Sequence, residues 1–338
     1  MKALRHILFP NPHSLIRLPI SYSLILLLFL ASCTKQEATL SVEEVARADS
    51  LALQVAVIPT LGCLPTYYAA RCGVFDEEGV HVKLLPYTAQ MDIDTALINR
   101  HAHVACTDLI RALRLSGQKT LVRAFLANDE TMSLVAVKGR RVNKVLQLKE
   151  RMIAISRLCI SDYWCEQFID SNDVARPDFY RPQIHDVRLR ADMLRTGLMD
   201  AAILPEPYTA WMQAVGNVRL AESTAKGPSF AAWVFADSLR TDTFRMNQIA
   251  RFALAYDKAA DMINEGEHKD IIRAILTHEY GIAPEALDSL SLPHMSPARK
   301  PKQEDVEAAA KWLKGKQRLP REARPDSLIY ELRTDSLR

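Results

Sequence analysis

The sequence predicts an α/β fold in which mostly parallel sheets are flanked by helices and the chain forms two lobes of similar construction. Three observations predict it: short apolar runs that alternate with helical patterns, a repeated helix–turn–strand unit, and a C-terminal region that is largely helical. The chain has 338 residues, of which 49% are hydrophobic and 25% are charged. This composition is that of a folded globular protein, and the length is sufficient for two or three domains.

Apolar runs that lack the alternation of a half-exposed strand recur along the chain. They are short and often β-branched, which is typical of strands buried on both faces of a sheet. We expect each run to form a strand. The runs comprise residues 55–58, 80–85, 104–106, 121–126, 134–137, 153–155, 201–204 and 231–235.

Helical patterns separate these runs and then dominate the C-terminal part of the chain. Strands that alternate with helices favour parallel sheets, because a crossover between parallel strands is usually helical. Gly73 and Gly197 follow two of the patterns, where a glycine readily takes the left-handed conformation that ends a helix. The patterns comprise residues 66–72, 92–100, 109–115, 162–170, 191–196 and 208–215, followed by 252–263, 269–278 and 304–314.

One helix–turn–strand unit occurs twice. Residues 97–106 and 194–203 each contain a helix end, a short turn, a polar residue and a buried strand. A polar loop follows each unit, with Thr107 and Asp108 after the first and Pro205-Glu206-Pro207 after the second. The repetition indicates two lobes of similar construction. The alternative is a chance similarity between two common units.

The N-terminal region has the features of an export signal. It contains Lys2, Arg5 and Arg17, no acidic residue precedes Glu37, and residues 20–31 form an apolar run. The run is shorter than the roughly 20 residues that span a bilayer, and it fits the core of a secretory signal.

The apolar run ends next to a cysteine. The sequence Leu30-Ala31-Ser32-Cys33 resembles the bacterial lipobox, in which the signal peptide is removed before a lipid-modified cysteine. The resemblance implies a signal peptide over residues 1–32, a polar tether over residues 33–50 and a membrane anchor on Cys33. The alternatives are an uncleaved anchor and a secretory signal followed by an unrelated cysteine.

The charge of the remaining chain argues against a nucleic-acid partner. Three of the 43 basic residues and none of the 40 acidic residues precede Cys33, so the rest of the chain is neutral. Affinity for nucleic acid depends largely on neutralisation of phosphates by basic residues. Aromatic residues make up only 7% of the chain, which also disfavours a stacking surface for single strands.

Four stretches, taken in order, resemble the type II periplasmic binding proteins of ABC importers. Residues 55–70 (VAVIPTLGCLPTYYAA) match the family's first strand, binding loop and helix, and residues 73–82 (GVFDEEGVHV) match the entry to its second strand. Residues 96–108 match a helix–turn–strand element, and residues 197–208 (GLMDAAILPEPY) match the most specific element. The resemblance spans about residues 51–319 and is closest to the branch that binds sulfonate, nitrate and thiamine precursors.

The resemblance implies a two-lobed clamshell, each lobe a mostly parallel sheet flanked by helices. Two hinge strands, near residues 133–137 and 231–236, would join the lobes, and a small-molecule solute would bind between them. The implied protein is a monomeric, exported, lipid-anchored component that faces the periplasm, needs no cofactor and delivers its solute to ABC permease and ATPase subunits. One lobe would comprise residues 51–132 and 237–319, the other residues 133–236, with a tail at 320–338.

Candidate solute contacts follow from the positions of the implied binding loops. Gly62 lets the backbone approach a ligand closely, and Arg157 suits an anionic group. Tyr67 and Trp164 suit a flat ring. Ordinary roles remain open: packing for Tyr67, N-capping for Thr107, solvation for Arg157 and helix capping for Glu206. The candidates are Thr60, Leu61, Gly62, Cys63 and Tyr67 after the first strand, Thr88 and Gln90 after the second, Thr107 and Asp108 after the third, and Ser156, Arg157, Cys159 and Glu206 in the other lobe.

Cysteines and histidines give weaker signals. Cys63, Cys106 and Cys159 lie at or after strand ends, so three thiols could meet and hold a soft metal, although burial as small apolar residues is the simpler interpretation. Cys159 and Cys165 are candidates for a disulfide. A histidine pair, residues 101 and 103, would share one face of a strand, but two histidines without a third ligand are a weak metal signal. We therefore assign no metal.

Enzymes of the same fold are the main alternative function. They include pyrimidine synthases, whose branch carries a CCCFC cysteine cluster that this sequence lacks, and chorismate dehydratases. The sequence also has no Walker loop and no CxxC or HExxH motif. We therefore expect a binding protein and not an enzyme, with a ligand-sensing lipoprotein as a further alternative.

Overall fold

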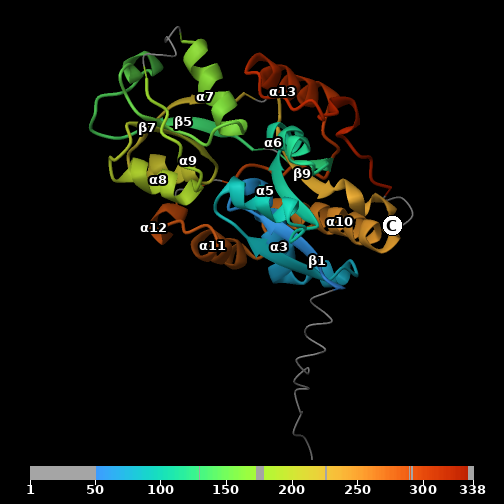
Figure 1. The fold of residues 1–338 in the computed structure, drawn as a ribbon. Helices are drawn as coiled ribbons and strands as arrows, with labels where there is room; N and C mark the ends of the chain where they lie inside the picture. Colours follow the sequence, from blue (N-terminus) through green and yellow to red (C-terminus); the bar gives the residue numbers. More distant parts are fainter. Residues whose placement is uncertain are drawn as a thin grey trace, which may run out of the picture. The chain divides into compact units, whose positions relative to one another are not determined.

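Two separate β-sheets, each covered by helices, form the centres of two lobes (Figure 1). The computed structural model describes residues 51–128, 130–172, 179–224, 227–288, 290 and 292–333, all within one unit of the chain. The predicted signal, tether and Cys33 lie outside the described residues. The α/β fold class predicted from the sequence is confirmed.

The first sheet has the strand order β2-β1-β3-β9-β4. β1 pairs in parallel with β2 and β3, whereas β9 runs antiparallel between β3 and β4. The first five residues of β9 are buried, which explains why this strand is a nearly unbroken apolar run. The strands are β1 (Leu53–Val57), β2 (Val82–Pro86), β3 (Val104–Asp108), β4 (Val122–Ala127) and β9 (Ala231–Ala236).

The second sheet has the strand order β6-β7-β5-β8. β6 and β7 are parallel, and β5 runs antiparallel to both β7 and β8. Each sheet is therefore mixed: its strands share one direction except for one strand, which pairs antiparallel with both of its neighbours. The strands are β5 (Met132–Ala136), β6 (Ile153–Ala154), β7 (Ala201–Pro205) and β8 (Val218–Glu222).

The strand of opposite direction in each sheet is the one that the chain enters from the other lobe. β5 is the first strand after β4, and β9 is the first strand after β8. The expected lobe boundaries differ here. Residues 231–236, which we assigned to the second lobe, form β9 of the first sheet, and Met132, which we assigned to the first lobe, begins β5 of the second. A short apolar strand fits the interior of either sheet, so its own sequence does not select the lobe.

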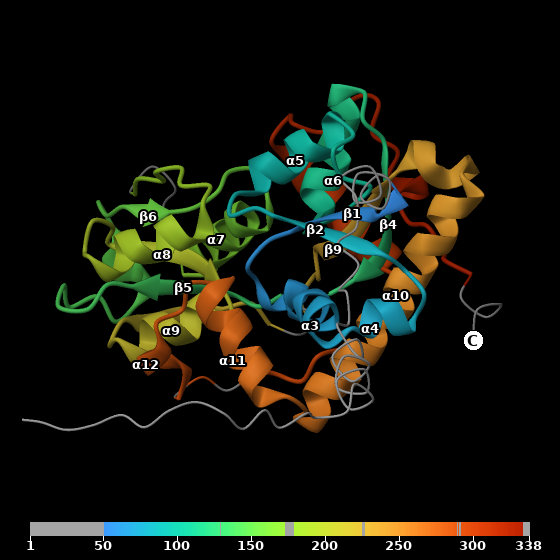
Figure 2. The same ribbon diagram turned by 90° about the horizontal axis from the view of Figure 1, so that it is seen from below.

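Helices cover both sheets, and two of them extend from the first lobe to the second. α11 contacts α3 of the first lobe, and α12 contacts α9 of the second (Figure 2). The first lobe contains α3 (Leu64–Cys72), α4 (Val74–Glu77), α5 (Gln90–Ile98), α6 (Leu109–Leu115), α10 (Thr243–Glu265), α11 (Lys269–His278), α12 (Pro284–Leu287) and α13 (Gln303–Gly315). The second lobe contains α7 (Ile160–Asp170), α8 (Val187–Arg195) and α9 (Tyr208–Ala214). Short 3-10 helices are η1 (Leu61–Cys63), η2 (Ser116–Gln118), η3 (Val145–Leu148), η5 (Asp237–Thr241) and η6 (Pro325–Ser327).

Helix ends follow local sequence signals. Asp108 precedes α6, and its carboxylate accepts a hydrogen bond from the Arg111 N–H at 2.9 Å. Asp186 caps α8 in the same way through the Leu189 N–H. Gly73 ends α3 with a φ of 76°, a conformation that costs glycine little.

The C-terminal segment covers the edge of the first sheet. The Tyr330 N–H donates to the Ala124 carbonyl at 2.8 Å, and the Ala124 N–H donates to the Leu328 carbonyl at 2.9 Å. The Leu328 side chain is buried. The tail expected at residues 320–338 therefore docks on β4 through residues 328–330, which occupies an otherwise open strand edge. Residues 334–338 lie outside the described residues.

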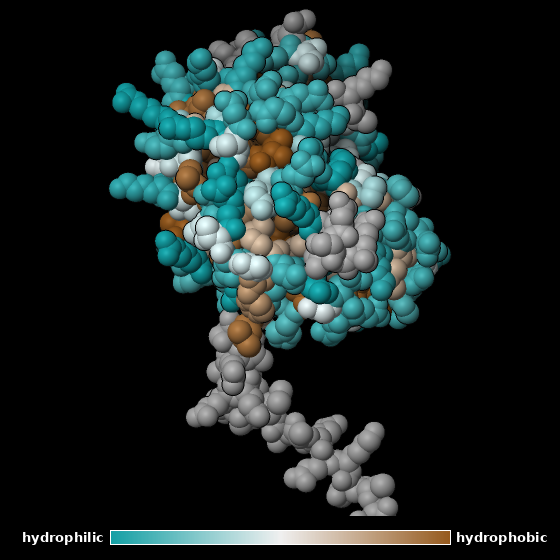
Figure 3. Space-filling model, turned by 90° about the vertical axis from the view of Figure 1, so that its right-hand side faces the viewer, coloured by the Kyte–Doolittle hydropathy of each residue, from teal (hydrophilic) through white to brown (hydrophobic). Residues whose placement is uncertain are grey.

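The surface carries its exposed hydrophobic side chains in small groups. The face shown in Figure 3 is mostly hydrophilic, with hydrophobic residues distributed between hydrophilic ones. Isolated exposed side chains such as Leu146 and Tyr180 are ordinary for a protein surface. Among the described residues, no helix combines the length and the apolar character needed to cross a membrane.

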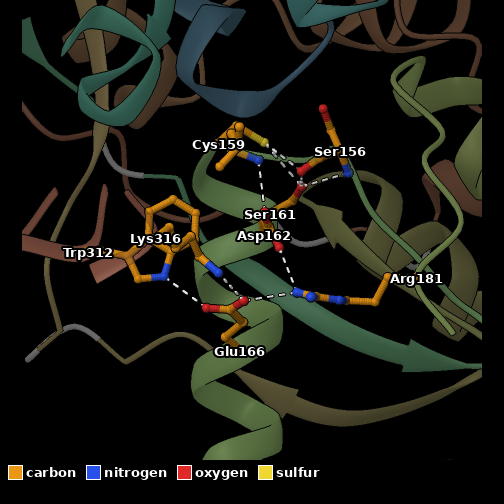
Figure 4. A network of polar contacts seen from close by, with 9 residues as sticks. Ser156, Cys159, Ser161, Asp162, Glu166, Arg181, Trp312 and Lys316 are labelled. Atoms are coloured by element: carbon orange, nitrogen blue, oxygen red, sulfur yellow. Dashed lines mark hydrogen bonds and ion pairs between the residues drawn. The ribbon is translucent and has the colours of Figure 1, made fainter. Parts of the chain in front are cut away.

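A buried carboxylate links the second lobe to the end of α13 (Figure 4). Glu166 on α7 accepts hydrogen bonds from Trp312 Nε1 at 3.0 Å and Arg181 Nη1 at 2.9 Å, and it pairs with Lys316 Nζ. The Glu166 side chain is 1% exposed. Burial alone would raise the pKa of Glu166, but the hydrogen bonds from Lys316, Trp312 and Arg181 outweigh burial and hold the pKa below its ordinary value.

Replacing Glu166 by glutamine is expected to lower the free energy of unfolding at pH 7 by about 2 kcal/mol, because charge-assisted hydrogen bonds become neutral ones. The folded-state pKa is depressed, so this contribution is present above the ordinary pKa of 4.5 and is lost as the pH falls through the folded-state value. Urea unfolding of both proteins at pH 7 and at low pH measures the difference.

The matched control is Glu304→Gln, which removes an exposed partner of Lys302. This change is expected to alter the free energy of unfolding by no more than about 0.5 kcal/mol. Equal stability of the Glu166→Gln and wild-type proteins at pH 7 would contradict the role assigned to the Glu166 network.

Candidate functional site

The two lobes contact each other through loops at the ends of their strands. The Leu61 N–H donates to the Glu206 carbonyl oxygen at 3.2 Å. The Ile160 N–H, at the start of α7, donates to Asp108 Oδ2 at 3.3 Å. Leu61, Asp108 and Glu206 are candidate contacts that the sequence places after strands, although Asp108 is itself the last residue of β3. These residues therefore lie at the boundary between the lobes.

The loop after β1 is held by residues from two other parts of the chain. Thr60 Oγ1 donates to Glu130 Oε2 at 3.2 Å, and Tyr280 Oη donates to the Thr60 carbonyl at 2.6 Å. A Cβ on Gly62 would lie 2.6 Å from Asn128 Nδ2, so the glycine permits close approach of the Asn128 side chain. Gly62 thus permits close approach of a neighbouring protein side chain, whereas the sequence suggested close approach of a ligand.

Three buried polar atoms in this region have no hydrogen-bond partner within the described part of the chain. They are Thr107 Oγ1, Asn128 Oδ1 and Arg190 Nε. Their side chains are only 2–4% exposed. Asn128 Nδ2 lies 3.5 Å from the thiol of Cys106, which precedes Thr107, and Arg190 interacts electrostatically with Glu130. Buried polar atoms without described partners therefore occur in both lobes near their boundary.

Burial controls the charge of this region. It raises the pKa of Asp108 to about 6 and the pKa of Glu130 to about 7. Burial also lowers the pKa of Arg190, although a guanidinium remains charged at neutral pH. The region thus combines one buried cation with two carboxyl groups that bind protons more tightly than usual.

The loop after β2 also reaches the second lobe. Thr88 Oγ1 donates to Asp186 Oδ2, and the Val187 N–H donates to the Thr88 carbonyl at 3.1 Å. Gln90 Oε1 is buried without a partner among the described residues. Thr88 thus joins the two lobes, and Gln90 begins α5 beside this contact.

Three candidates of the second lobe are engaged by their own lobe. The Cys159 thiol donates to the Ser156 carbonyl at 3.0 Å, and the Ser161 hydroxyl donates to the same carbonyl at 2.9 Å. The Ala210 N–H donates to Glu206 Oε2 at 3.1 Å, so the Glu206 side chain has the helix-capping role that the sequence left open. Burial raises the pKa of Glu206.

The two aromatic candidates pack against different neighbours. Tyr67 meets Tyr280 edge-on with ring centroids 5.6 Å apart, and Trp164 stacks on Phe168 at 5.6 Å. Burial raises the pKa of Tyr67 well above its ordinary value, so its hydroxyl is neutral. Tyr67 therefore has the packing role that the sequence left open.

Arg157 lines a pocket of about 380 Å³ between the lobes. α5 and α6 form one side of the pocket, and the loops before α7 and α8 form the other. Arg111 and Arg114 of α6 line it together with Arg157 and His185. Arg157 is exposed, as a solvated arginine would be. It also lines the same pocket as Arg111 and Arg114.

The three thiols do not form the cluster considered from the sequence. Cys63 and Cys106 interact with each other in the first lobe, whereas Cys159 is bonded to Ser156 in the second. The disulfide considered between Cys159 and Cys165 is not formed in the described part of the chain. The position of a cysteine near a strand end predicts that it lies close to the boundary between the lobes. It does not predict on which side of the boundary the thiol lies.

The histidine pair does not supply a metal site. His103 Nδ1 accepts a hydrogen bond from the Gln54 N–H at 3.0 Å, and burial lowers the pKa of His103 to about 4. Within the described ranges, no group of three His, Cys, Asp or Glu side chains is placed to hold a metal ion.

Three residues of this region were not among the candidates: Asn128, Glu130 and Arg190. Asn128 and Glu130 lie between two apolar runs, where the sequence predicts that the chain passes from one lobe to the other. That position does not predict a role for their side chains. Arg190 had a detectable signal. The buried residues of α8 are Val187, Arg190, Ala191 and Leu194, so the arginine occupies a position where the helical spacing predicts an apolar residue.

Comparison with solved structures shows the same fold in solute-binding proteins. The alkanesulfonate-binding protein SsuA from Xanthomonas axonopodis pv. citri, bound to MOPS, is 14% identical, with a TM-score of 0.70 over 83% of this chain and 98% of that one. The aliphatic sulphonate binding protein SsuA from Escherichia coli is 12% identical, with a TM-score of 0.68 over 82% and 97%. The nitrate-binding protein NrtA from Synechocystis PCC 6803 is 12% identical, with a TM-score of 0.71 over 84% and 86%.

The family assignment comes from the sequence. No curated protein matches the chain. The sequence profile of the family described as NMT1/THI5 like matches residues 62–265, which is more than half of the chain and includes most of the loops between the lobes. The chain therefore belongs to the NMT1/THI5-like family.

Proposed function

We propose that this protein is the solute-binding component of an ABC import system. It captures a small anionic or heteroaromatic organic solute, such as a sulfonate, a nitrate-like anion or a pyrimidine, between its two lobes. It then delivers the solute to a membrane permease that is driven by an ATPase. The family assignment and the shared fold with sulfonate-binding and nitrate-binding proteins support this proposal.

The observation that carries the proposal is the set of buried polar atoms without partners. Thr107 Oγ1 and Asn128 Oδ1 belong to the first lobe or the segment that leaves it, and Arg190 Nε belongs to the second. An unsatisfied buried polar group costs about 1–3 kcal/mol, and native proteins contain few of them. A polar solute held between the lobes would satisfy all three.

We call the buried region around Thr107, Asn128, Glu130 and Arg190 the inner region. Its charges support an anionic or polar heteroaromatic solute. Arg190 supplies a buried guanidinium, which suits an anion. Since the pKa of Glu130 is raised to about 7, its carboxyl group is partly protonated at neutral pH and can donate or accept a hydrogen bond at a ring nitrogen. The remaining carboxylates, Asp108 and Glu206, are engaged at helix N-termini.

The same geometry favours binding over catalysis. Asp108 and Glu206 hold backbone N–H groups, and Cys159 donates to a backbone carbonyl, so these potential acid–base or nucleophilic groups have structural partners. Burial raises the pKa of Cys159, which disfavours the reactive thiolate. We therefore propose no catalytic residue.

The N-terminal sequence completes the proposal. Residues 1–32 would direct export, and the lipid on Cys33 would hold the monomeric protein at a bacterial membrane, facing the periplasm. Residues 33–50 would separate the body from the membrane, so that the lobes reach the permease.

Thermal unfolding and calorimetry of the purified chain test the proposal. The panel is methanesulfonate, taurine, nitrate and a hydroxymethylpyrimidine. A bound solute at a hundred times its dissociation constant should add about 2.7 kcal/mol of stability. Uptake of that solute by cells with and without this chain then distinguishes an importer component from a sensor. Uptake should depend on the chain only if it belongs to an importer. Absence of binding across the panel would count against these solute classes.

Thr107→Val is expected to separate binding from stability. The substitution removes a buried hydroxyl without a partner, so the free energy of unfolding should rise by about 1 kcal/mol. Affinity for the solute identified above should fall about tenfold, since a hydrogen-bonding group is lost. Thr209→Val is the control, because its hydroxyl already donates to the Leu204 carbonyl, and this variant should lose stability. Unchanged affinity in Thr107→Val would remove Thr107 from the site.

Glu130→Gln is expected to stabilise the protein in alkaline solution only. The folded-state pKa of about 7 lies above the ordinary value of 4.5, so folding takes up a proton between these values and wild-type stability falls as the pH rises through this window. Glutamine has no such dependence, so the variant should be more stable than wild type at pH 8 and similar at pH 4. Urea unfolding at both values measures the effect, and an equal difference at pH 4 and pH 8 would refute it.

Cys33→Ser is expected to release the protein from the membrane. In bacteria fed radiolabelled palmitate, the wild-type chain should be labelled and sediment with membranes. The variant should carry no label and should stay uncleaved before residue 33. Ala31→Gly is a control that keeps a small residue in the lipobox. Palmitate label on the Cys33→Ser protein would exclude Cys33 as the anchor.

A further inference from the structure

The pocket that contains Arg157 is separate from the inner region around Glu130. It has a volume of about 380 Å³, which is sufficient for a small ligand or one end of a larger one. Asp94, Arg111 and Arg114 line it from the first lobe, and Arg157 and His185 line it from the second. Both lobes therefore contribute charged or polar groups to the same space.

Two positive charges in this pocket lack a carboxylate partner. Arg111 is already neutralised, because its Nε and Nη2 donate to the two carboxylate oxygens of Asp94. Arg114 Nη1 donates to the Leu158 carbonyl at 3.3 Å, and no described carboxylate forms an ion pair with Arg114 or Arg157. Three arginines and one aspartate leave the lining with a net charge of two positive units.

The pKa values of two lining groups are set first by burial and then by nearby charges. Burial lowers the pKa of Arg114 and the like charge of Arg111 lowers it further, whereas Asp94, Asp108 and Cys159 oppose this change. Burial, Arg111 and Arg190 lower the pKa of His185, against a smaller opposite effect of Asp92. His185 is therefore neutral at pH 7, and its Nδ1 shares a hydrogen bond with Ser156 Oγ at 2.9 Å. Its Nε2 lies against the side-chain amide of Gln183, so the imidazole has protein neighbours at both ring nitrogens and adds no positive charge to the pocket.

We propose that this pocket binds a dianionic group of the solute, as in a phosphate monoester or a phosphonate. The inference rests on the proposed solute-binding function and specifies the class of solute. Two guanidinium groups match two negative charges, and the planar fork of arginine suits phosphate oxygens. A sulfonate or nitrate carries a single charge and would leave one guanidinium unmatched.

The position of the two arginines also links binding to closure. Arg114 belongs to the first lobe and Arg157 to the second, so a dianion that contacts both favours the arrangement in which the lobes are together. The Arg114–Leu158 hydrogen bond already joins the lobes at the edge of the pocket. A bound dianion thereby adds ionic contacts between two lobes that hydrogen bonds of the protein already join.

The test compares phenyl phosphate with benzenesulfonate, which share a ring and differ in charge. Calorimetry of the full chain in a mild detergent at pH 7.5 and 50 mM salt should show phenyl phosphate binding at least tenfold more tightly than benzenesulfonate. Inorganic phosphate is the third probe, and it distinguishes a site for the free ion from a site for an ester. Arg114→Gln and Arg157→Gln should each weaken phenyl phosphate binding at least tenfold, whereas the exposed Arg321→Gln should not change it.

The outcomes separate this inference from the proposed function. Thermal unfolding of each variant first verifies that it folds. Tight binding of benzenesulfonate or nitrate with no preference for the dianion would overturn the inference and leave the solute-binding function standing. Absence of phenyl phosphate binding to the folded wild-type chain would also overturn it. Loss of phenyl phosphate binding in Arg321→Gln to the same extent as in Arg157→Gln would show a non-specific charge effect and overturn the pocket assignment.

Discussion

One buried carboxylate accepts hydrogen bonds from both lobes and joins them at the ends of their elements. Asp108 ends β3 and accepts hydrogen bonds from the Arg111 N–H of its own lobe and the Ile160 N–H of the other. It thus lies at the N-termini of α6 and α7 together, where two helix dipoles favour negative charge. Burial opposes that charge and raises the pKa of Asp108 to about 6, so the two backbone donors and the nearby Arg111 offset part of a real cost. Leu61, Thr88 and Arg114 form further hydrogen bonds between the lobes.

The inner region contains buried polar groups that lower the stability of the fold. A boundary with only a structural role would not require them. An apolar side chain at Arg190 would pack on the buried stripe of α8 without the desolvation cost of a guanidinium. Thr107 and Asn128 likewise retain polar atoms that no described group satisfies. Functional sites commonly retain such unfavourable groups because the ligand supplies the missing interactions. This pattern is the physical reason for placing the solute between the lobes.

The sequence predicted most of the fold and part of the boundary between the lobes, where the candidate site lies. Buried strands such as β3 and β7 could be predicted from the sequence. Both of their faces are covered, so their first residues form an uninterrupted apolar run. The lobe that contains β9 was not visible, because strand pairing is a non-local property that a short apolar run does not encode. Loops at strand ends identified Thr107 and Asp108. Glu130 and the partner of each thiol depend on how the two lobes approach each other, which no local spacing determines.

The two groups of charges have different physical consequences for a solute. Arg190 is buried, so its interaction with a ligand is little screened by salt and acts mainly on the rate of dissociation. Arg157 is exposed at the outer pocket, so it acts over a longer range in solution, is screened by salt and mainly increases the rate of encounter. A dianionic group of the proposed solute would therefore meet the outer arginines first, and its contacts with Arg114 and Arg157 would favour the closed arrangement of the lobes. In the inner region, the Arg190 guanidinium would suit a polar or anionic part of the proposed solute, because a buried charge without a partner is costly.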